Sequence, residues 1–240
     1  MLRSLLLISA VVFAAQSVVT AEDKPDPKKP VTSEKEAGPD FALQGEYTGV
    51  IKAGSGELKL GVQVIALGGD KFRAVAYPGG LPGDGWNKDL GRHEAEGELK
   101  DGVVSFAKSD AGSGEIRDGR LQITVAGVQI GDLSRVVRKS ETVGKTAPAG
   151  AVVLFDGSTA EHFDGGKMTE DGLLMQGCTS KEKFQDFTLH VEFQLSYMPL
   201  ARGQGRSNSG CYMQGRYEVQ MLDSFGLEGK NNECGGIYTI

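Results

Sequence analysis

Short stretches of alternating polar and apolar residues, separated by glycines, limit most strongly what this chain can fold into. Residues 58–66 place an apolar side chain at every second position, close to the period of two of a β-strand. Residues 46–51 and 71–77 are similar. Glycine accounts for 35 of the 240 residues, about twice its usual share, and recurs singly between such stretches, as turn residues do. The pattern predicts an all-β protein.

An Asp-Gly pair occurs twice in the same context. The run GELKDG at 97–102 recurs as GEIRDG at 114–119. Each copy indicates strand, turn and strand, because Asp-Gly suits a type I′ hairpin, whose two central residues need positive φ. We therefore predict that residues 41–139 form a small antiparallel β-meander domain. The repetition of this run reflects hairpin geometry rather than a functional repeat.

Two polar segments divide the rest of the chain. Residues 22–40, EDKPDPKKPVTSEKEAGPD, are rich in proline and charge, and they predict a disordered linker because they offer little surface to bury. Residues 140–150, SETVGKTAPAG, predict a second linker of small and polar residues. A second domain is expected over residues 151–240, where an apolar run begins.

The first 21 residues have the features of a signal peptide. Arg3 gives a basic start, residues 5–15 form an apolar run, and a small residue, Ala21, precedes the expected cleavage site. The run is too short to cross a bilayer, which needs about 20 residues. We expect Glu22 to become the first residue, the protein to be exported to the periplasm or the extracellular space, and no membrane attachment after cleavage.

The charge of the chain argues against a nucleic-acid partner. The formal net charge is −6, and the basic residues occur only in short groups such as Lys28-Lys29. A phosphate backbone would need a basic patch. The three histidines stand apart from one another and from any cysteine pair, so a zinc site of the usual kind is not expected.

Three cysteines remain after signal cleavage, and an odd number leaves at least one thiol without a partner inside the chain. Cys178 and Cys211 could pair with each other, since exported proteins form disulfides. All three, Cys234 included, could instead be buried thiols.

Two stretches of the second domain alternate most clearly. Residues 187–195 carry Phe, Leu, Val, Phe and Leu at every second position, and Tyr217, Val219 and Met221 alternate with Arg216, Glu218 and Gln220. Both stretches predict half-buried strands with an apolar core face. Their polar faces are either solvated, which is the simpler interpretation of the pattern alone, or they line a groove suited to sugar hydroxyls.

The order of motifs in this domain resembles a known family. The blocks are LFDG (154–157), DGLL (171–174), FQDFTLHVEF (184–193), SNSG (207–210), GRYEVQMLDS (215–224) and CGGIY (234–238). In order and spacing they are similar to the 3-keto-disaccharide hydrolases, formerly domain of unknown function 1080, which are also described as 3-keto-glucoside 1,2-lyases and 3-keto-2-hydroxyglucal hydratases. The series departs from the family at Gln194 and Gln214, where arginine is common.

The resemblance implies a fold, and it implies that the chain is a piece of a longer protein. The family fold is a concanavalin A-like jelly-roll sandwich, and residues 151–240 would hold about its first half. We therefore expect a small antiparallel β-meander domain followed by the first half of such a sandwich, in a fragment of the whole protein.

The resemblance also implies a carbohydrate substrate and a mechanism. A 3-keto group acidifies the C2 proton of a sugar, so a base can remove it, the C1 substituent leaves by β-elimination, and water adds back. The candidate catalytic residues are Glu218, Asp223 and Glu192, with Glu218 first as the base. The candidate substrate-binding residues are Gln220, Arg216, Asn208 and Tyr238. A divalent cation on the ketone would be a natural electrophile, but no cation motif identifies one.

Two alternatives belong to other classes of function. Glu218-x-Gln220-x-x-Asp223 is similar to the Glu-x-Asp-x-x-Glu strand of jelly-roll glucanases, with an amide at the middle acid, and would indicate an ordinary two-carboxylate glycosidase. The same fold also serves non-catalytic carbohydrate-binding or adhesion modules. Turnover of a 3-keto-disaccharide separates catalysis from binding.

Overall fold

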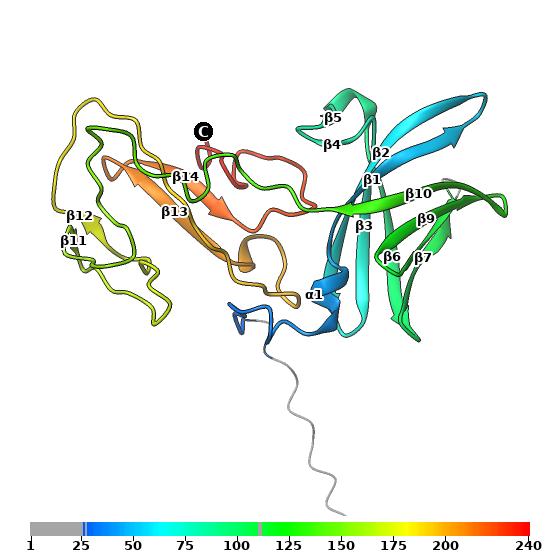
Figure 1. Cartoon of the computed structure of the whole chain (residues 1–240), viewed down its shortest axis with the longest axis horizontal. Helices are drawn as coiled ribbons and strands as arrows, with labels where there is room; N and C mark the ends of the chain where they lie inside the picture. The colour runs from blue at the N-terminus through cyan, green and yellow to red at the C-terminus, as the bar shows by residue number, and fades with distance from the viewer. Residues whose placement is uncertain (1–25, 27, 110–111) are drawn as a thin grey trace, which may run out of the picture.

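The computed structural model describes residues 26, 28–109 and 112–240 (Figure 1). The predicted signal peptide, residues 1–21, and its cleavage site before Glu22 lie outside the described residues. Within the described part of the chain, no helix is long and apolar enough to cross a membrane. The described residues are almost entirely strands, turns and extended segments, so the predicted all-β class is confirmed.

In the described part of the chain, eight antiparallel strands close into a barrel, in the order β1-β10-β9-β8-β7-β6-β3-β2 (Figure 1). The strands are β1 (Gly45–Ala53), β2 (Gly56–Gly68), β3 (Lys71–Pro78), β6 (His93–Lys100), β7 (Val103–Ser109), β8 (Gly112–Arg117), β9 (Arg120–Val125) and β10 (Val128–Val136). Most strands pair with their neighbours along the chain, so the predicted meander is confirmed. Strands β1 and β10 also pair, with Tyr47 opposite Arg135, and the sequence did not indicate this pairing. The pairing leaves the sheet without a free edge strand.

Short elements surround the barrel strands. Helix α1 (Pro39–Leu43) leads into β1, and the connection from β3 to β6 holds β4 (Leu81–Pro82), β5 (Gly85–Trp86) and the 3-10 helix η1 (Lys88–Leu90). This connection packs closely on β2, because a Cβ at Gly61 would lie only 2.5 Å from the backbone nitrogen of Leu81.

Both Asp-Gly pairs form the predicted hairpin turns. Asp101 and Gly102 connect β6 to β7 with φ of 51° and 79°, and Asp118 and Gly119 connect β8 to β9 with φ of 51° and 72°. Positive φ at both central residues is what a type I′ turn requires. The repeated run therefore encodes two equivalent hairpins.

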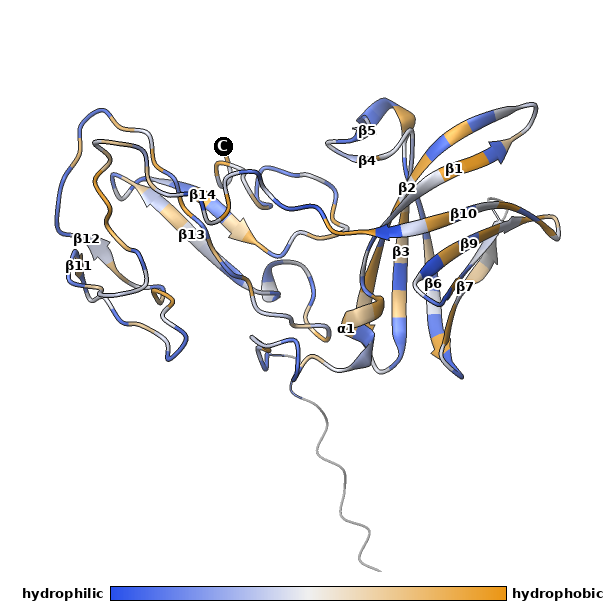
Figure 2. Ribbon diagram, viewed as in Figure 1, coloured by the Kyte–Doolittle hydropathy of each residue, from blue (hydrophilic) through white to orange (hydrophobic). Residues whose placement is uncertain are grey.

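The core of the barrel is built from alternate positions of its strands. Leu60, Val62, Val64 and Ala66 of β2 all belong to one buried cluster, as the period of two predicts. Figure 2 shows the corresponding alternation of hydrophobic and hydrophilic residues along β2 and β3. Other fully buried members of the cluster are Tyr47, Phe72, Val104, Ile116 and Leu133.

The opposite face of β2 and β3 is also buried, against the C-terminal part of the chain. Ile65, Val75 and Tyr77 form a second cluster, against which Trp86 and Phe225 pack. Burial on both faces explains why the alternation of β2 gives way to a continuous apolar run at residues 64–67.

Hydrogen bonds join the barrel to the loop that follows Phe225. The backbone nitrogen of Gly226 donates to Oε1 of Gln63 at 3.2 Å. Arg73 Nη2 donates to the carbonyl of Gly226 at 3.3 Å, and Arg92 Nη1 donates to the carbonyl of Leu227 at 2.9 Å. Apolar packing and directed hydrogen bonds therefore fix this loop on the barrel.

The second domain has less regular structure than predicted. Within described residues 151–240, β11 (Phe163–Asp164) pairs with β12 (Thr179–Ser180), and β13 (Asn208–Met213) pairs with β14 (Tyr217–Leu222). The 3-10 helix η2 (Gly203–Gly205) precedes β13. Extended loops make up most of the remainder (Figure 1).

The strand predicted over residues 187–195 is wrong. The segment contains no strand and joins no strand of the described chain. Of its alternating apolar side chains, four are exposed, Phe187 and Phe193 at 48% and 49% among them, and Leu195 is half-buried. Alternation alone does not make a strand, because a ladder needs a neighbour that supplies hydrogen bonds and an apolar face. None of the described segments takes that place.

Residues 28–40 differ from the predicted disordered linker. Val31 and Tyr197 exchange backbone hydrogen bonds of 3.0 and 2.7 Å, and Ala37 is buried in the barrel core cluster. Val31 and Ala37 pack against the barrel core, which the composition of the segment did not indicate. Residues 22–25 and 27 of that linker lie outside the described residues. Residues 140–150 are exposed and contain no strand.

The barrel is expected to fold by itself, because its hairpins are local and its sheet is closed. Residues 41–139 expressed alone should give a β-rich circular dichroism spectrum and one cooperative thermal transition. Phe72→Asp should abolish the transition, since Phe72 is fully buried and an unpaired charge would enter the core. Val50→Asp is the control, because Val50 is 54% exposed. A barrel segment without a cooperative transition would show that it depends on the second domain.

Candidate functional site

The β13–β14 hairpin brings three predicted site residues and one further polar residue, Tyr212, to the same face. Tyr212 lies opposite Glu218, Gly210 opposite Gln220, and Asn208 opposite Leu222. Directly opposed residues of an antiparallel pair point to the same side of the sheet. Asn208, Tyr212, Glu218 and Gln220 therefore share a side, which we call the polar hairpin face.

Glu218 is held across the neighbouring strand. The hydroxyl of Tyr212 donates a hydrogen bond to Oε2 of Glu218 at 2.8 Å. Gly210 leaves the space for the carboxylate, because a Cβ at that position would collide with the side chain of Glu218. The hydrogen bond to the Glu218 carboxylate raises the pKa of Tyr212. Tyr212 is therefore a protonated donor at neutral pH, beside a carboxylate that is still partly exposed.

A network of amides continues from Glu218 along the same face. Gln220 is 2% exposed, and its Nε2 donates to Oε1 of Gln204 at 3.0 Å. Asn208 Nδ2 also donates to the carbonyl and to Oε1 of Gln204, at 3.1 and 3.2 Å. Oε1 of Gln220 is buried and has no hydrogen-bond partner among the described residues. A buried water molecule would satisfy this acceptor.

The last described segment of the chain lies alongside β14. The backbone nitrogen of Tyr238 donates to the carbonyl of Glu218 at 2.9 Å, and Gly235 and Gly236 bond to the backbone of Gln220 at 2.8 and 2.9 Å. Val219 and Ile237 form an antiparallel bridge. This pairing sets Tyr238 opposite Glu218, so the two side chains lie on the same side of the sheet.

Comparison with protein families places this hairpin in a known domain. Residues 150–240 match the 3-keto-alpha-glucoside-1,2-lyase-like domain family. The family expected from the order of motifs is thus confirmed, and the matched residues, which we call the lyase-like domain, contain the whole polar hairpin face. No curated protein and no solved structure matches the chain.

Asp223 of the lyase-like domain forms an ion pair with Arg206, which is not part of the polar hairpin face. Its Oδ2 accepts hydrogen bonds from Nη2 and Nε of Arg206 at 2.6 and 3.0 Å, and Arg206 also donates to the carbonyl of Phe225 at 3.0 Å. The side chains of Arg206 and Asp223 are 8% and 18% exposed. Asp223 is therefore held by Arg206 in a largely buried ion pair.

Glu192 and Arg216 also lie apart from the polar hairpin face. Oε1 of Glu192 lies 3.1 Å from Nε2 of His190 and accepts a hydrogen bond from the nitrogen of Gly144 at 2.7 Å. These contacts, that with His190 first, lower the pKa of Glu192. Arg216 is exposed, with its guanidinium 5.5 Å from the ring of Tyr217. Of the predicted site residues, Glu218, Gln220, Asn208 and Tyr238 come together.

The predicted core face of β14 is wrong. Tyr217 was expected inside and Gln220 outside, yet Tyr217 is 44% exposed while Gln220 and Leu222 are 2% and 1% exposed. The reason is local: Gln204 and Asn232 contact the amide of Gln220 and cover this side of the hairpin. The pattern of a single strand cannot show which of its faces loops will cover.

Sequence reasoning missed Tyr212, Gly210 and Gln204. The sequence could have indicated Gly210 and Tyr212. They alternate with Asn208 along one strand, so all three residues lie on the same side of it. Gln204 lies in the 3-10 turn before that strand, and nothing in its sequence context indicates that it contacts Gln220.

Neither a metal centre nor a disulfide is found in the described residues. No group of three or more His, Cys, Asp or Glu side chains there is placed to hold a metal ion. Within the described chain, Cys178, Cys211 and Cys234 are free thiols. Burial raises the pKa of Cys178 and of Cys211, which keeps both protonated at neutral pH.

Proposed function

We propose that the lyase-like domain cleaves 3-keto-glycosides by elimination followed by hydration, with the polar hairpin face as its site. The observation that carries the proposal is the carboxylate of Glu218, held over Gly210 by the hydroxyl of Tyr212 within the matched family domain. The exposed side chains of Gln204, Asn208 and Tyr238 supply the directional donors and acceptors that a sugar ring needs.

The first half of the reaction removes two substituents from neighbouring carbons. Glu218 accepts the proton from C2 of the sugar, and the electron pair of that bond forms the C1–C2 double bond. The C1 oxygen leaves with its bonding pair and takes up a proton from solvent. The 3-keto group conjugates with the new double bond and carries the negative charge that develops. Tyr212, a protonated donor beside Glu218, is placed to stabilise such charge.

The second half adds water to the same two carbons. The hydroxyl of water bonds to C1 and the remaining proton of that water passes to solvent, while a proton returns to C2 from the carboxylic acid that Glu218 has become. The net change is hydrolysis of the glycosidic bond, with the base restored. General acid–base catalysis of this kind typically contributes about 10²–10⁴ in rate.

The geometry favours elimination over the two-carboxylate glycosidase. That mechanism needs two carboxyl groups on either side of the scissile bond, about 5–9.5 Å apart. Glu218 is the one carboxylate of the described polar hairpin face, and the second acid of the glucanase-like pattern, Asp223, is engaged by Arg206.

The test is turnover of a defined substrate by the full chain. p-Nitrophenyl 3-keto-glucoside should release nitrophenol over many turnovers, whereas p-nitrophenyl glucoside, which lacks the acidifying ketone, should not. Cleavage of both compounds at similar rates would indicate an ordinary glycosidase. Saturable binding of the keto compound without release, by protein with an intact circular dichroism spectrum, would indicate a binding module.

A further inference from the structure

Elimination from a glycoside needs a proton at the C1 oxygen as well as a base at C2. An alkoxide is a poor leaving group, and an acid placed beside the oxygen supplies the proton faster than solvent does. Such an acid must hold a proton at neutral pH and must lie next to Glu218, because C1 and C2 are adjacent atoms. A side chain with both properties would be a second catalytic residue.

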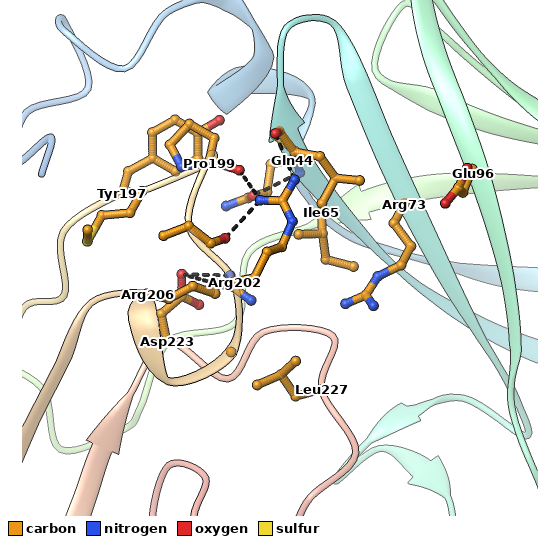
Figure 3. Close-up of a pocket in the computed structure, with 15 residues that line it drawn as sticks. Gln44, Ile65, Arg73, Glu96, Tyr197, Pro199, Arg202, Arg206, Asp223 and Leu227 are labelled. Carbon is orange, nitrogen blue, oxygen red and sulfur yellow. Dashed lines mark hydrogen bonds and ion pairs between the residues drawn. The ribbon is translucent and has the colours of Figure 1, made fainter. Parts of the chain in front are cut away.

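The carboxylates of the lyase-like domain do not meet these requirements. Of the described residues, Glu218 is the one carboxylate of the polar hairpin face, and it begins the reaction as the base. Figure 3 shows Asp223 directed at Arg206, which donates to its Oδ2 at 2.6 and 3.0 Å. Asp223 is the acceptor in this ion pair, so it has no proton to give.

Two tyrosines flank Glu218 on the same side of the sheet. Tyr212 lies opposite Glu218 on β13, and Tyr238 lies opposite it on the segment that pairs with the other edge of β14. Directly opposed residues of an antiparallel pair have Cβ atoms about 4.5–5.5 Å apart. The three side chains therefore form a row across the sheet with the base in the middle, and a sugar ring placed over Glu218 is within reach of both tyrosines.

The hydroxyls of the two tyrosines differ in what they contact. That of Tyr212 donates to Oε2 of Glu218 at 2.8 Å, so its proton is directed at the base. That of Tyr238 has no hydrogen-bond partner among the described residues, and Tyr238 is 37% exposed. A phenol keeps its proton at neutral pH and is a stronger acid than an alcohol. Tyr238 therefore has a proton that is available to a substrate oxygen.

Backbone hydrogen bonds hold Tyr238 in its place beside the base. Its nitrogen donates to the carbonyl of Glu218 at 2.9 Å. Two residues further on, Nδ2 of Asn231 donates to the carbonyl of Ile240 at 3.0 Å. The side chain of Tyr238 is thus carried by backbone that is paired with β14, as a group that must be positioned for proton transfer requires.

We propose that Tyr238 is the general acid of the elimination, an inference that rests on the function proposed above. As Glu218 removes the C2 proton and the C1–oxygen bond breaks, the phenolic proton passes to the departing oxygen and Tyr238 becomes a phenolate. In the hydration, the phenolate takes a proton from the water whose hydroxyl bonds to C1, and Glu218 returns its proton to C2. Tyr238 thus makes the proton transfers that solvent would otherwise make.

The nature of the leaving group tests this assignment. Nitrophenolate is a stable anion that leaves without a proton, whereas methoxide needs one. Tyr238→Phe keeps the aromatic ring and removes the hydroxyl. In the full chain it should lower the turnover of methyl 3-keto-glucoside by about 10²–10⁴, and that of the p-nitrophenyl compound by a factor at least about tenfold smaller. A role in binding alone would lower both by the same factor, because the two compounds share the sugar ring.

Variants of two neighbouring tyrosines complete the test. Tyr217→Phe is the matched control, because Tyr217 is 44% exposed on the opposite side of β14, and it should turn over both compounds like the wild type. Equal losses for the two compounds with folded Tyr238→Phe, or no loss, would overturn the assignment and leave Glu218 as the base. A selective loss with Tyr212→Phe instead would make Tyr212 the acid. A wild type that releases neither leaving group would overturn the proposed function, and this inference with it.

Discussion

Replacing Glu218 by glutamine is expected to lower the turnover of a 3-keto-glucoside by about 10²–10⁴, which is the usual cost of losing a general base. The amide keeps the shape of the side chain and can still accept the hydrogen bond from Tyr212, which is 2.8 Å long in the wild type. The fold should therefore persist, and substrate should still bind. Steady-state kinetics and the circular dichroism spectrum of the same preparation check both parts of the expectation.

Glu192→Gln is the matched control for this variant. Glu192 is the other glutamate that the sequence proposes for catalysis, but its contacts are with His190 and Gly144 on an exposed segment. Its loss should leave turnover within about twofold, since exposed substitutions away from a site usually change little. Normal turnover by the Glu218 variant would show that Glu218 is not the base. A large loss with the Glu192 variant would show that Glu192 takes part in the reaction.

Removing the carboxylate of Asp223 is expected to destabilise the lyase-like domain rather than to act on chemistry directly. Asp223→Ala leaves the guanidinium of Arg206, which is 8% exposed, without its counter-charge. Breaking a buried ion pair from one side typically costs about 3–5 kcal/mol. Urea unfolding followed by the fluorescence of Trp86, the single tryptophan of the chain, reports the effect, because Trp86 packs in the cluster that also contacts Phe225.

A double variant separates loss of the pair from loss of a catalytic group. Arg206→Met with Asp223→Leu replaces both charges by apolar side chains and should recover much of the lost stability. Asp171→Ala, at an exposed position of the same domain, should leave the unfolding midpoint unchanged. If Asp223→Ala unfolded like the wild type and yet abolished turnover, Asp223 would be the catalytic acid that its sequence position suggests.

The barrel was largely predictable because its determinants are local. Period-two patterns define β1 to β3, and two Asp-Gly turns define the hairpins β6–β7 and β8–β9. Closure was not predictable, since the pairing of β1 with β10 joins residues such as Tyr47 and Arg135, whose side chains carry no complementary pattern in the sequence. Long-range pairing depends on the whole sheet and not on any one strand.

The sequence predicted which residues of the candidate site belong to a motif. It could not predict which of them tertiary contacts bury or pair. Glu218 and Gln220 follow from the motif, and the hairpin register then adds Tyr212. The burial of Gln220 and the pairing of Asp223 with Arg206 depend on loops that lack any period. The extended segment 187–195 shows the converse, because its alternation is strong and yet none of the described segments pairs with it.

Turnover of a 3-keto-glucoside in D₂O tests the elimination mechanism most directly. Elimination breaks the C2–H bond, and the proton on the partly exposed Glu218 exchanges with solvent before it returns, so the released 3-keto-glucose should carry deuterium at C2 by NMR. Incubation without protein, and with the Glu218→Gln variant, measures exchange that the ketone undergoes unaided. Deuterium at C2 above that background is the predicted result. Product that forms rapidly and retains hydrogen at C2 would contradict the mechanism, because direct hydrolysis leaves that bond intact.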